Sequence, residues 1–282
     1  MDKQLTKMTD SAYSISFEEL KEIQKLIEKV HGYDFHDYAE ASLKRRVTHI
    51  MSKFKLNTFD LKHRLVNDTH FFALFLNQVT VNVTEMFRDP GFYRSVRENV
   101  IPYLASYPHI KIWNAGCSSG EETYSFAITL KEEGILEKSF LYGTDINSEV
   151  LDKAKEGIYE LKKIKEYSTN YLNSGGKSSL SDYYHSIYDA GIFQSELRKK
   201  TLFSIHNLAS DSSFNEFQLV VCRNVLIYFN EHLRNRVLEL LSESLCHLGF
   251  LCLGSKETLR NPKLLEQYKV IDKKENIYQK IV

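Results

Sequence analysis

The stretch Trp113-Asn-Ala-Gly-Cys-Ser-Ser-Gly-Glu-Glu-Thr-Tyr-Ser-Phe-Ala127 decides the fold of this chain. It predicts a strand that runs into a loop of small residues and then into a helix. Such a loop presents backbone N–H groups and a helix N-terminus to a ligand. Asp145 follows in Gly143-Thr-Asp-Ile146, directly after a second apolar strand. Loop, helix, strand and acid in this order are typical of an open α/β sheet that holds a nucleoside, with the acid on the ribose hydroxyls.

The loop taken alone has simpler interpretations. It lacks the three-glycine pattern of dinucleotide-binding loops, and small residues at such a turn often serve packing only. Glu121 and Glu122 are favoured at a helix start by the helix dipole, and Asp145 could simply cap the next helix. The functional interpretation is that Glu122 accepts a hydrogen bond from a ligand amine or hydroxyl.

Composition places the chain among ordinary globular proteins. Its 282 residues are 43% hydrophobic and 26% charged, and the formal net charge is zero. Because the net charge is zero, we expect no nucleic-acid binding. We also expect no membrane insertion, because no stretch approaches the ~20 apolar residues of a bilayer span. The four cysteines show no metal-ligand spacing, so we expect no metal site and a reducing, cytoplasmic location; they are Cys117, Cys222, Cys246 and Cys252.

Residues 1–80 predict a small helical domain. A capping box, Ser16-Phe-Glu-Glu19, begins a helix that His31-Gly32 ends. Two further helices are expected over Tyr38–Lys55 and Phe59–Asn77 from their apolar periodicity. Residues 81–108 are expected to form a linker, in which Asn82–Asp89 taken alone is most often a capped loop between domains.

Strands alternate with helices over residues 109–282, which predicts a mostly parallel sheet with helices on both faces and a closing antiparallel strand. Residues 160–200 interrupt the alternation, so we expect an insertion or lid there, without clear strand pairing. Helices are expected from Glu121, Asn147 and Glu231, and strands over Ile110–Asn114, Phe140–Thr144, Leu202–His206, Phe217–Cys222, Phe250–Gly254, Tyr268–Ile271 and Ile277–Val282.

Polar residues follow two of these strands, where parallel sheets bind ligands. Arg223, Asn224 and Tyr228 come after Phe217–Cys222, and three polar groups in so apolar a run are costly unless paired or used. After the other strand, Asn207 is placed to read an adenine edge and Leu208 to pack on the ring. The second helix carries a group of cations and a histidine, either a solvated face or a grip for an acidic helix or a phosphate backbone: Lys44, Arg45, Arg46, His49 and Lys53.

Five motifs, in order along nearly the whole chain, resemble the chemotaxis protein-glutamate O-methyltransferases, the CheR family. They are Asn82-Val-Thr-Glu-Met-Phe-Arg-Asp89, the opening stretch, Gly143-Thr-Asp-Ile146, His206-Asn-Leu208 and Cys222-Arg-Asn-Val-Leu-Ile-Tyr-Phe229. The resemblance implies a Rossmann-like class I methyltransferase sheet, mostly parallel with an antiparallel last strand, behind a small all-helical N-terminal domain. It also implies S-adenosylmethionine as cofactor, S-adenosylhomocysteine as product, and methylation of glutamates on the cytoplasmic helices of chemoreceptors by a monomer.

The resemblance implies roles for individual residues. Arg88 and Tyr228 would lie near the transferable methyl group and act as the catalytic residues. The group on the second helix, Lys44 to Lys53, would face the receptor. The linker over residues 81–108 would also be a cofactor-contacting segment. The cofactor would be surrounded by Asn82, Thr84, Arg88, Gly116, Glu122, Asp145, Asn207, Leu208, Arg223 and Asn224.

The chain departs from the family pattern in places. Gln218 stands where an acid is usual, and Gly254-Ser-Lys-Glu257 replaces Gly-His-Ser-Glu. Because we expect no strand pairing within residues 160–200, we expect no tether to a receptor's C-terminal peptide. The alternatives are a nicotinamide oxidoreductase, which the missing glycine pattern disfavours, a non-catalytic signalling adaptor, and a methyltransferase of another acidic protein.

Overall fold

The computed structural model describes residues 13–80 and 84–282. Two compact units make up the chain, and each is discontinuous in sequence. The first contains Met1–Val81 and Tyr228–Arg234, and the second contains Asn82–Ile227 and Asn235–Val282. Within the described ranges, none of the helices has both the length and the apolar character needed to cross a bilayer.

In the described part of the first unit, the helices that lie wholly within it are four: α2 (Phe17–His31), α3 (Glu40–Phe54), α4 (Thr58–Asn67) and α5 (Thr69–Val79). The predicted capping box is confirmed, since the Ser16 hydroxyl accepts from the Glu19 N–H and the Glu19 carboxylate accepts from the Ser16 N–H. Gly32 ends α2 in the left-handed conformation at φ 75°. The buried faces of the four helices meet in one core, which includes Ile23, Val47, Leu61 and Phe71.

The prediction of one helix over Phe59–Asn77 is wrong. Asp68 leaves the helical conformation at φ −125° and ψ 94°, and so separates α4 from α5. Its carboxylate accepts from the Phe71 N–H at 2.9 Å and caps α5. The apolar periodicity runs on across the break because both helices bury residues in the same core, so periodicity alone does not reveal it.

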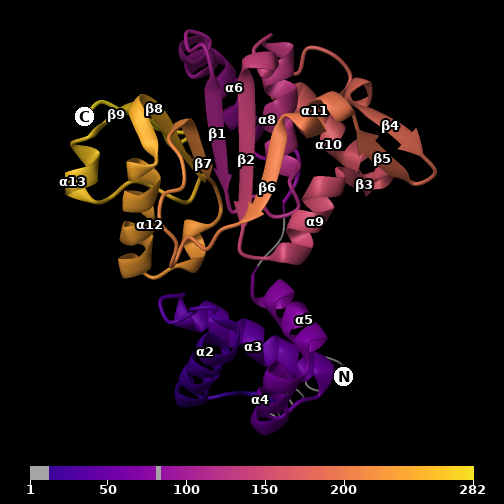
Figure 1. The fold of residues 1–282 in the computed structure, drawn as a ribbon, viewed down its shortest axis with the longest axis vertical. Coiled ribbons are helices and arrows are strands. Elements are labelled where there is room, and N and C mark those ends of the chain that lie inside the picture. Colours follow the sequence, from indigo (N-terminus) through magenta and orange to yellow (C-terminus); the bar gives the residue numbers. More distant parts are fainter. Residues whose placement is uncertain (1–12, 81–83) are drawn as a thin grey trace, which may run out of the picture. The chain divides into compact units, whose positions relative to one another are not determined.

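The second unit contains a seven-stranded sheet in the order β6-β2-β1-β7-β8-β10-β9 (Figure 1). β6, β2, β1, β7 and β8 are parallel, and β10 is antiparallel to both of its neighbours. This arrangement confirms the predicted fold class. The strands are β1 (Ile110–Ala115), β2 (Ser139–Asp145), β6 (Thr201–Ile205), β7 (Phe217–Cys222), β8 (Leu245–Leu253), β9 (Tyr268–Asp272) and β10 (Ile277–Lys280).

Alternate residues of the central strands serve two different cores, as expected for strands covered on both faces. Ile112 of β1 and Leu219 of β7 pack into one core together with Phe126 of α8. Trp113, the next residue along β1, stacks on Phe217 instead. The helices around the sheet are α6 (Pro90–Asn99), α7 (Ile101–Leu104), α8 (Glu121–Glu132), α9 (Ser148–Glu156), α12 (Glu231–Glu243) and α13 (Pro262–Leu265), with short 3-10 turns at Leu136–Lys138 and Leu226–Tyr228.

A separate three-stranded antiparallel sheet, β3-β5-β4, corrects the expectation of no strand pairing around residues 160–200. It comprises β3 (Ile158–Glu160), β4 (Tyr184–Ile187) and β5 (Ala190–Phe193), with α10 (Leu161–Asn173), a 3-10 turn at Leu180–Tyr183 and α11 (Ser195–Lys199). The hairpin turn is Tyr188-Asp189, with Tyr188 at φ 52°, and it lacks the Asn-Gly or Asp-Gly pair that usually marks such turns. We expected no tether to a receptor's C-terminal peptide because we expected no strands here. The observed sheet removes that reason.

Candidate functional site

The loop Gly116–Gly120 joins β1 to α8 and is fastened to the end of β2. The N–H groups of Gly116 and Cys117 donate to the Thr144 carbonyl at 2.8 and 2.9 Å. Gly116 has φ +74°, and a Cβ there would lie 2.4 Å from the Val225 side chain. Only glycine fits this position, because both the conformation and the space exclude a larger residue.

Asp145 lies at the end of β2 and fixes the same loop from the other side. Its Oδ2 accepts from the Ser118 N–H at 2.9 Å, and its Oδ1 accepts from the Asn147 N–H at 3.0 Å. The cap of α9 is the Asn147 side chain, which accepts from the Glu149 N–H, so the interpretation of Asp145 as a helix cap is wrong. Burial raises the pKa of Asp145 above its usual value.

Arg223, just after β7, is the centre of a buried ion cluster. Its guanidinium donates to Glu122 at 2.7 Å and to Asp89 at 2.6 Å, and it lies 4.0 Å above the Phe92 ring. Burial alone would lower the pKa of Arg223, but Glu122 and Asp89 reverse that effect and the pKa is raised. The charge in this apolar strand is therefore paired, as its cost requires.

The segment Thr84–Asp89 is held against α8 and Arg223 in a constrained backbone conformation. Phe87 and Asp89 have φ 53° and 57°, which side-chain-bearing residues rarely adopt. The Phe87 N–H donates to the Ser125 hydroxyl at 3.0 Å, and the Arg88 carbonyl accepts from Arg223 at 3.4 Å. The structure thus brings the backbone of Arg88 to the cluster, while Asn82 lies outside the described residues.

Glu257 supports the strand-end loop that carries Asn224, and sequence reasoning missed this role. Its Oε2 accepts from the Asn224 and Gly254 N–H groups at 2.8 Å each, and its Oε1 accepts from the Ile227 N–H at 3.2 Å. Asn224 needs the support because it has φ 62°. The sequence has an acid, Glu257, three residues after Gly254, as the family motif does. That shared position is the signal from which a role for Glu257 could have been predicted.

The end of β6 reaches the same edge of the sheet. The His206 N–H donates to the Asp145 carbonyl at 3.1 Å. The Asn207 side-chain oxygen accepts from the Ala209 N–H at 3.0 Å, and Leu208 is buried. These two residues therefore follow the end of β6, whose last residue, Ile205, pairs with Asp145, and their adenine contacts stay a prediction.

Four buried polar atoms at this edge have no hydrogen-bond partner within the described part of the chain. They are Asn114 Oδ1 at the end of β1, Ser118 Oγ in the loop, Nε of Arg223 and Nδ1 of His206. Buried polar atoms are normally paired, so an unpaired group of them near one loop indicates room for a polar ligand. Donors and acceptors are both present, which fits an amino-acid tail or a nucleoside.

Gln218, at the position that is usually acidic, has a structural role. Its Oε1 accepts from the Lys111 N–H at 2.7 Å, where β7 lies beside β1. An amide serves this contact as well as a carboxylate does. The departure at Gln218 therefore falls on a contact between β1 and β7.

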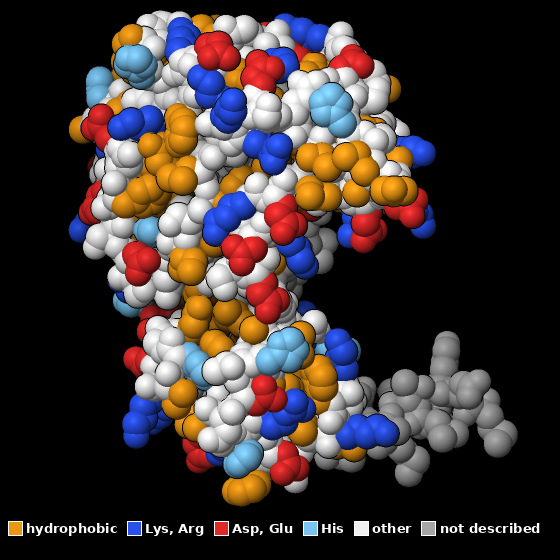
Figure 2. Space-filling view, turned by 45° about the vertical axis from the view of Figure 1, so that its right-hand side comes forward, with side chains coloured by type: hydrophobic (Ala, Val, Ile, Leu, Met, Phe, Trp, Pro, Cys, Tyr) orange, Lys and Arg blue, Asp and Glu red, His pale blue; other side chains and the backbone are white. Residues whose placement is uncertain are grey.

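Helix α3 in the helical unit carries the basic group, and its members differ in exposure. Arg45, His49 and Lys53 are exposed, while Lys44 and Arg46 are partly buried. Arg46 lies over the ring of Tyr228 at 4.6 Å. Lys and Arg are mixed with Asp and Glu on the face that Figure 2 shows. Since the formal net charge of the chain is zero, attraction to an acidic partner must come from a local group such as this one.

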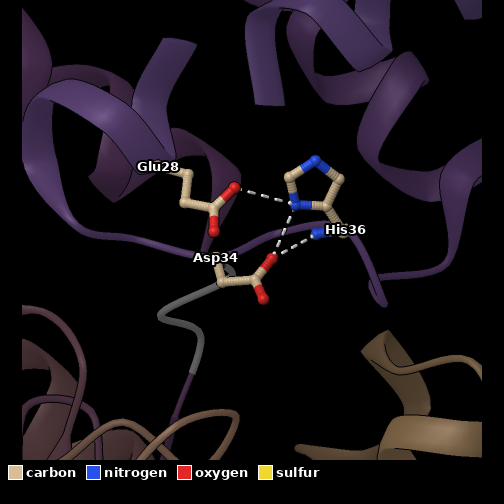
Figure 3. Close-up of side chains that lie close together, drawn as sticks. All are labelled: Glu28, Asp34 and His36. Atoms are coloured by element: carbon tan, nitrogen blue, oxygen red, sulfur yellow. Dashed lines mark hydrogen bonds and ion pairs between the residues drawn. The ribbon is translucent and has the colours of Figure 1, made fainter. Parts of the chain in front are cut away.

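Glu28, Asp34 and His36 gather near the end of α2 (Figure 3). Asp34 Oδ1 accepts from the His36 N–H at 2.8 Å and lies 2.8 Å from its Nδ1. Glu28 Oε2 lies 3.5 Å from the same nitrogen. These contacts stabilise the loop between α2 and α3, and this structural role accounts for the arrangement.

Comparison with known proteins decides the family. Residues 82–275 match the CheR methyltransferase SAM-binding domain, and residues 18–80 match the CheR methyltransferase all-alpha domain. The chain belongs to the CheR methyltransferase family. Its cofactor is S-adenosylmethionine, the ligand for which the matched domain is described.

Individual relatives agree with the CheR assignment. The chain is 46% identical over 263 residues to a methyltransferase named Cher3 of Pseudomonas putida, covering 92% of this chain and 96% of that one. It is 30% identical over 247 residues to a chemotaxis protein methyltransferase of Listeria monocytogenes, covering 84% and 89%. A solved structure, the glycopeptide N-methyltransferase MtfA complexed with sinefungin, is 10% identical with a TM-score of 0.37 over 61% of this chain and 50% of that one, and the assignment does not depend on it.

Proposed function

We propose that this CheR methyltransferase transfers methyl groups from S-adenosylmethionine to glutamate side chains of chemoreceptors in the cytoplasm and forms glutamate methyl esters. The observation that carries the proposal is the similarity, over most of both chains, to proteins named chemotaxis protein methyltransferase. The exposed Arg45, His49 and Lys53 on α3 support it, because chemoreceptor methylation helices offer acidic side chains.

The fixed loop and strand ends suit the cofactor that the family binds. We assign Gly116, Asp145 and the Asn207–Leu208 pair to the nucleoside and tail, with Asn114 and Ser118 supplying the unpaired polar atoms. Glu122, Arg223 and Asn224 form the adjoining wall, and Asn82, Thr84 and Arg88 are proposed to close it. When bound, S-adenosylmethionine supplies a methyl group on a positively charged sulfur.

The protein side of the reaction needs little proton transfer. A glutamate with a pKa near 4.3 is already ionised at neutral pH, so no general base is required. The residues must instead hold the carboxylate in line with the methyl group and exclude water, and orientation of this kind supplies a large share of the rate. We assign that orientation to Arg88 and Tyr228.

The test uses labelled S-adenosylmethionine and purified cytoplasmic fragments of chemoreceptors from the source cell. We expect label in a base-labile ester that mass spectrometry places on glutamate, and its loss when that glutamate is replaced by glutamine. Arg88→Ala should reduce both S-adenosylhomocysteine affinity and methyl transfer. Binding of receptor without any methyl transfer would indicate the signalling adaptor instead, and label on a different acidic protein would indicate another substrate.

A further inference from the structure

Arg46 differs from the other cations of α3 in what it contacts. Its guanidinium carbon lies 4.6 Å from the centre of the Tyr228 ring, and its Nη1 donates to the carbonyl of Val79, the last residue of α5. Arg45, the preceding residue, is exposed. Arg46 therefore joins α3, the end of α5 and Tyr228 within the helical unit.

The backbone around Tyr228 is already fixed, so the ring is what Arg46 can control. The Ala39 N–H donates to the Tyr228 carbonyl at 2.9 Å. Phe229 packs edge-on against Tyr38 at 5.2 Å, and the Asn230 amide donates to Asp37 at 2.8 Å. With these anchors in place, the remaining freedom of Tyr228 is rotation of its side chain between rotamers. A cation held over one ring face favours a single orientation.

We propose that Arg46 is a positioning residue for methyl transfer, which holds the Tyr228 ring in its working orientation and does not serve as a receptor contact. The inference rests on the proposed function, in which Tyr228 lies near the transferable methyl group. It also divides the basic group of α3 into two roles. The exposed Arg45, His49 and Lys53 attract the receptor, and Arg46 acts through Tyr228.

The two roles predict different kinetics. Loss of a receptor contact raises KM for the receptor and leaves kcat nearly constant, whereas loss of an orienting contact lowers kcat. We expect Arg46→Ala to reduce kcat by about ten- to hundredfold, with S-adenosylhomocysteine affinity and receptor KM within about twofold of wild type. Arg46→Lys should restore activity only in part, because an ammonium cannot stack as a planar guanidinium does. Arg45→Ala, which removes the same charge from the neighbouring residue, should raise KM.

A double-mutant cycle tests whether Arg46 acts through Tyr228. In a Tyr228→Ala background, Arg46→Ala should change kcat by less than about twofold. An effect of Arg46→Ala on KM alone, or an equal loss of kcat with and without Tyr228, would overturn the inference. If the wild-type protein methylates no receptor, the proposed function fails, and the same cycle is measured by thermal unfolding: non-additive losses of melting temperature support the Arg46–Tyr228 contact, and additive losses refute it.

Discussion

Glu122 already forms an ion pair with Arg223 in the absence of a ligand. One carboxylate oxygen of Glu122 accepts from Arg223 at 2.7 Å, and the other lies 3.5 Å from the Asn114 amide. A ligand amine must therefore share Glu122 with Arg223, since the guanidinium is almost fully buried and has few other acceptors. Glu122 therefore has a structural role, because it neutralises the buried charge of Arg223. We propose that the same side chain also contacts the cofactor.

The neighbouring Glu121 should make stability depend on pH. Burial raises the pKa of Glu121 from 4.5 to about 7. The folded chain thus holds this proton more tightly than the unfolded chain, so the contribution is complete below pH 4.5 and is lost as the pH rises through about 7. Glu121→Gln should remove that loss, a gain of at most about 3 kcal/mol at pH 8 relative to wild type.

Urea unfolding at pH 5 and pH 8 measures the Glu121 effect as the change in unfolding free energy between the two conditions. Glu243→Gln is the matched control, because Glu243 is exposed on α12 and should leave the difference as in wild type. An unchanged pH difference in Glu121→Gln would contradict the prediction.

At the scale of elements, β3 is connected directly to the loop Gly116–Gly120, which we propose holds the cofactor. The Tyr159 hydroxyl on β3 donates to the Ser119 carbonyl at 2.6 Å. Tyr159→Phe leaves that carbonyl without its partner and loosens the loop. We expect S-adenosylhomocysteine affinity to fall about tenfold, or ~1.4 kcal/mol, by calorimetry.

Tyr124→Phe supplies the control for Tyr159. The Tyr124 hydroxyl donates to the Ala154 carbonyl at 2.9 Å, a buried contact of the same kind outside the loop. Tyr124→Phe should lower the free energy of unfolding, while the affinity for S-adenosylhomocysteine stays near that of wild type. Equal losses of affinity in both variants would mean that general destabilisation, and not the loop, explains the effect.

Elements with strong local patterns could be predicted from the sequence, and those defined by distant partners could not. The capping box at Ser16 and the apolar run of β7 are both patterns of consecutive residues that can be seen in the sequence. The Tyr188-Asp189 hairpin carries a weak local signal, because tertiary packing stabilises it. The cap that Asp68 provides for α5 is local, but the apolar periodicity that continues across it favours a single helix. The same holds in the site: the loop and Asp145 could be recognised from spacing, whereas the support of Asn224 by Glu257 joins residues 33 positions apart.

At the scale of the whole molecule, Asn230 anchors a segment that lies late in the chain to the helical unit. Its backbone N–H donates to the Asp37 carbonyl at 2.9 Å, and its side-chain amide donates to the Asp37 carboxylate at 2.8 Å. Asn230→Ala removes this side-chain bond and also the bond in which the Asn230 side-chain oxygen accepts from the Leu233 N–H of α12 at 2.9 Å. We expect amide hydrogen exchange of the first turns of α3 to rise about fivefold, the equivalent of ~1 kcal/mol. Exchange in β1 and β2 should stay unchanged.

Asn261→Ala is the control for this experiment. Asn261 caps α13 in the other unit by accepting from the Lys263 N–H, so the substitution removes a similar side-chain hydrogen bond elsewhere. Exchange in α3 should not respond to it. If both variants raised exchange in α3 equally, the role of Asn230 as a local anchor would be refuted.

The discontinuous units have a consequence for evolution. Residues 228–234 complete the helical unit although they are encoded far from the rest of it, between two parts of the sheet unit. A recombination event that exchanged only the first 81 residues would separate Asp37 and Arg46 from the Asn230 and Tyr228 with which they pair. A functional chimera that exchanges the helical unit therefore has to carry the seven-residue segment along with the N-terminal helices.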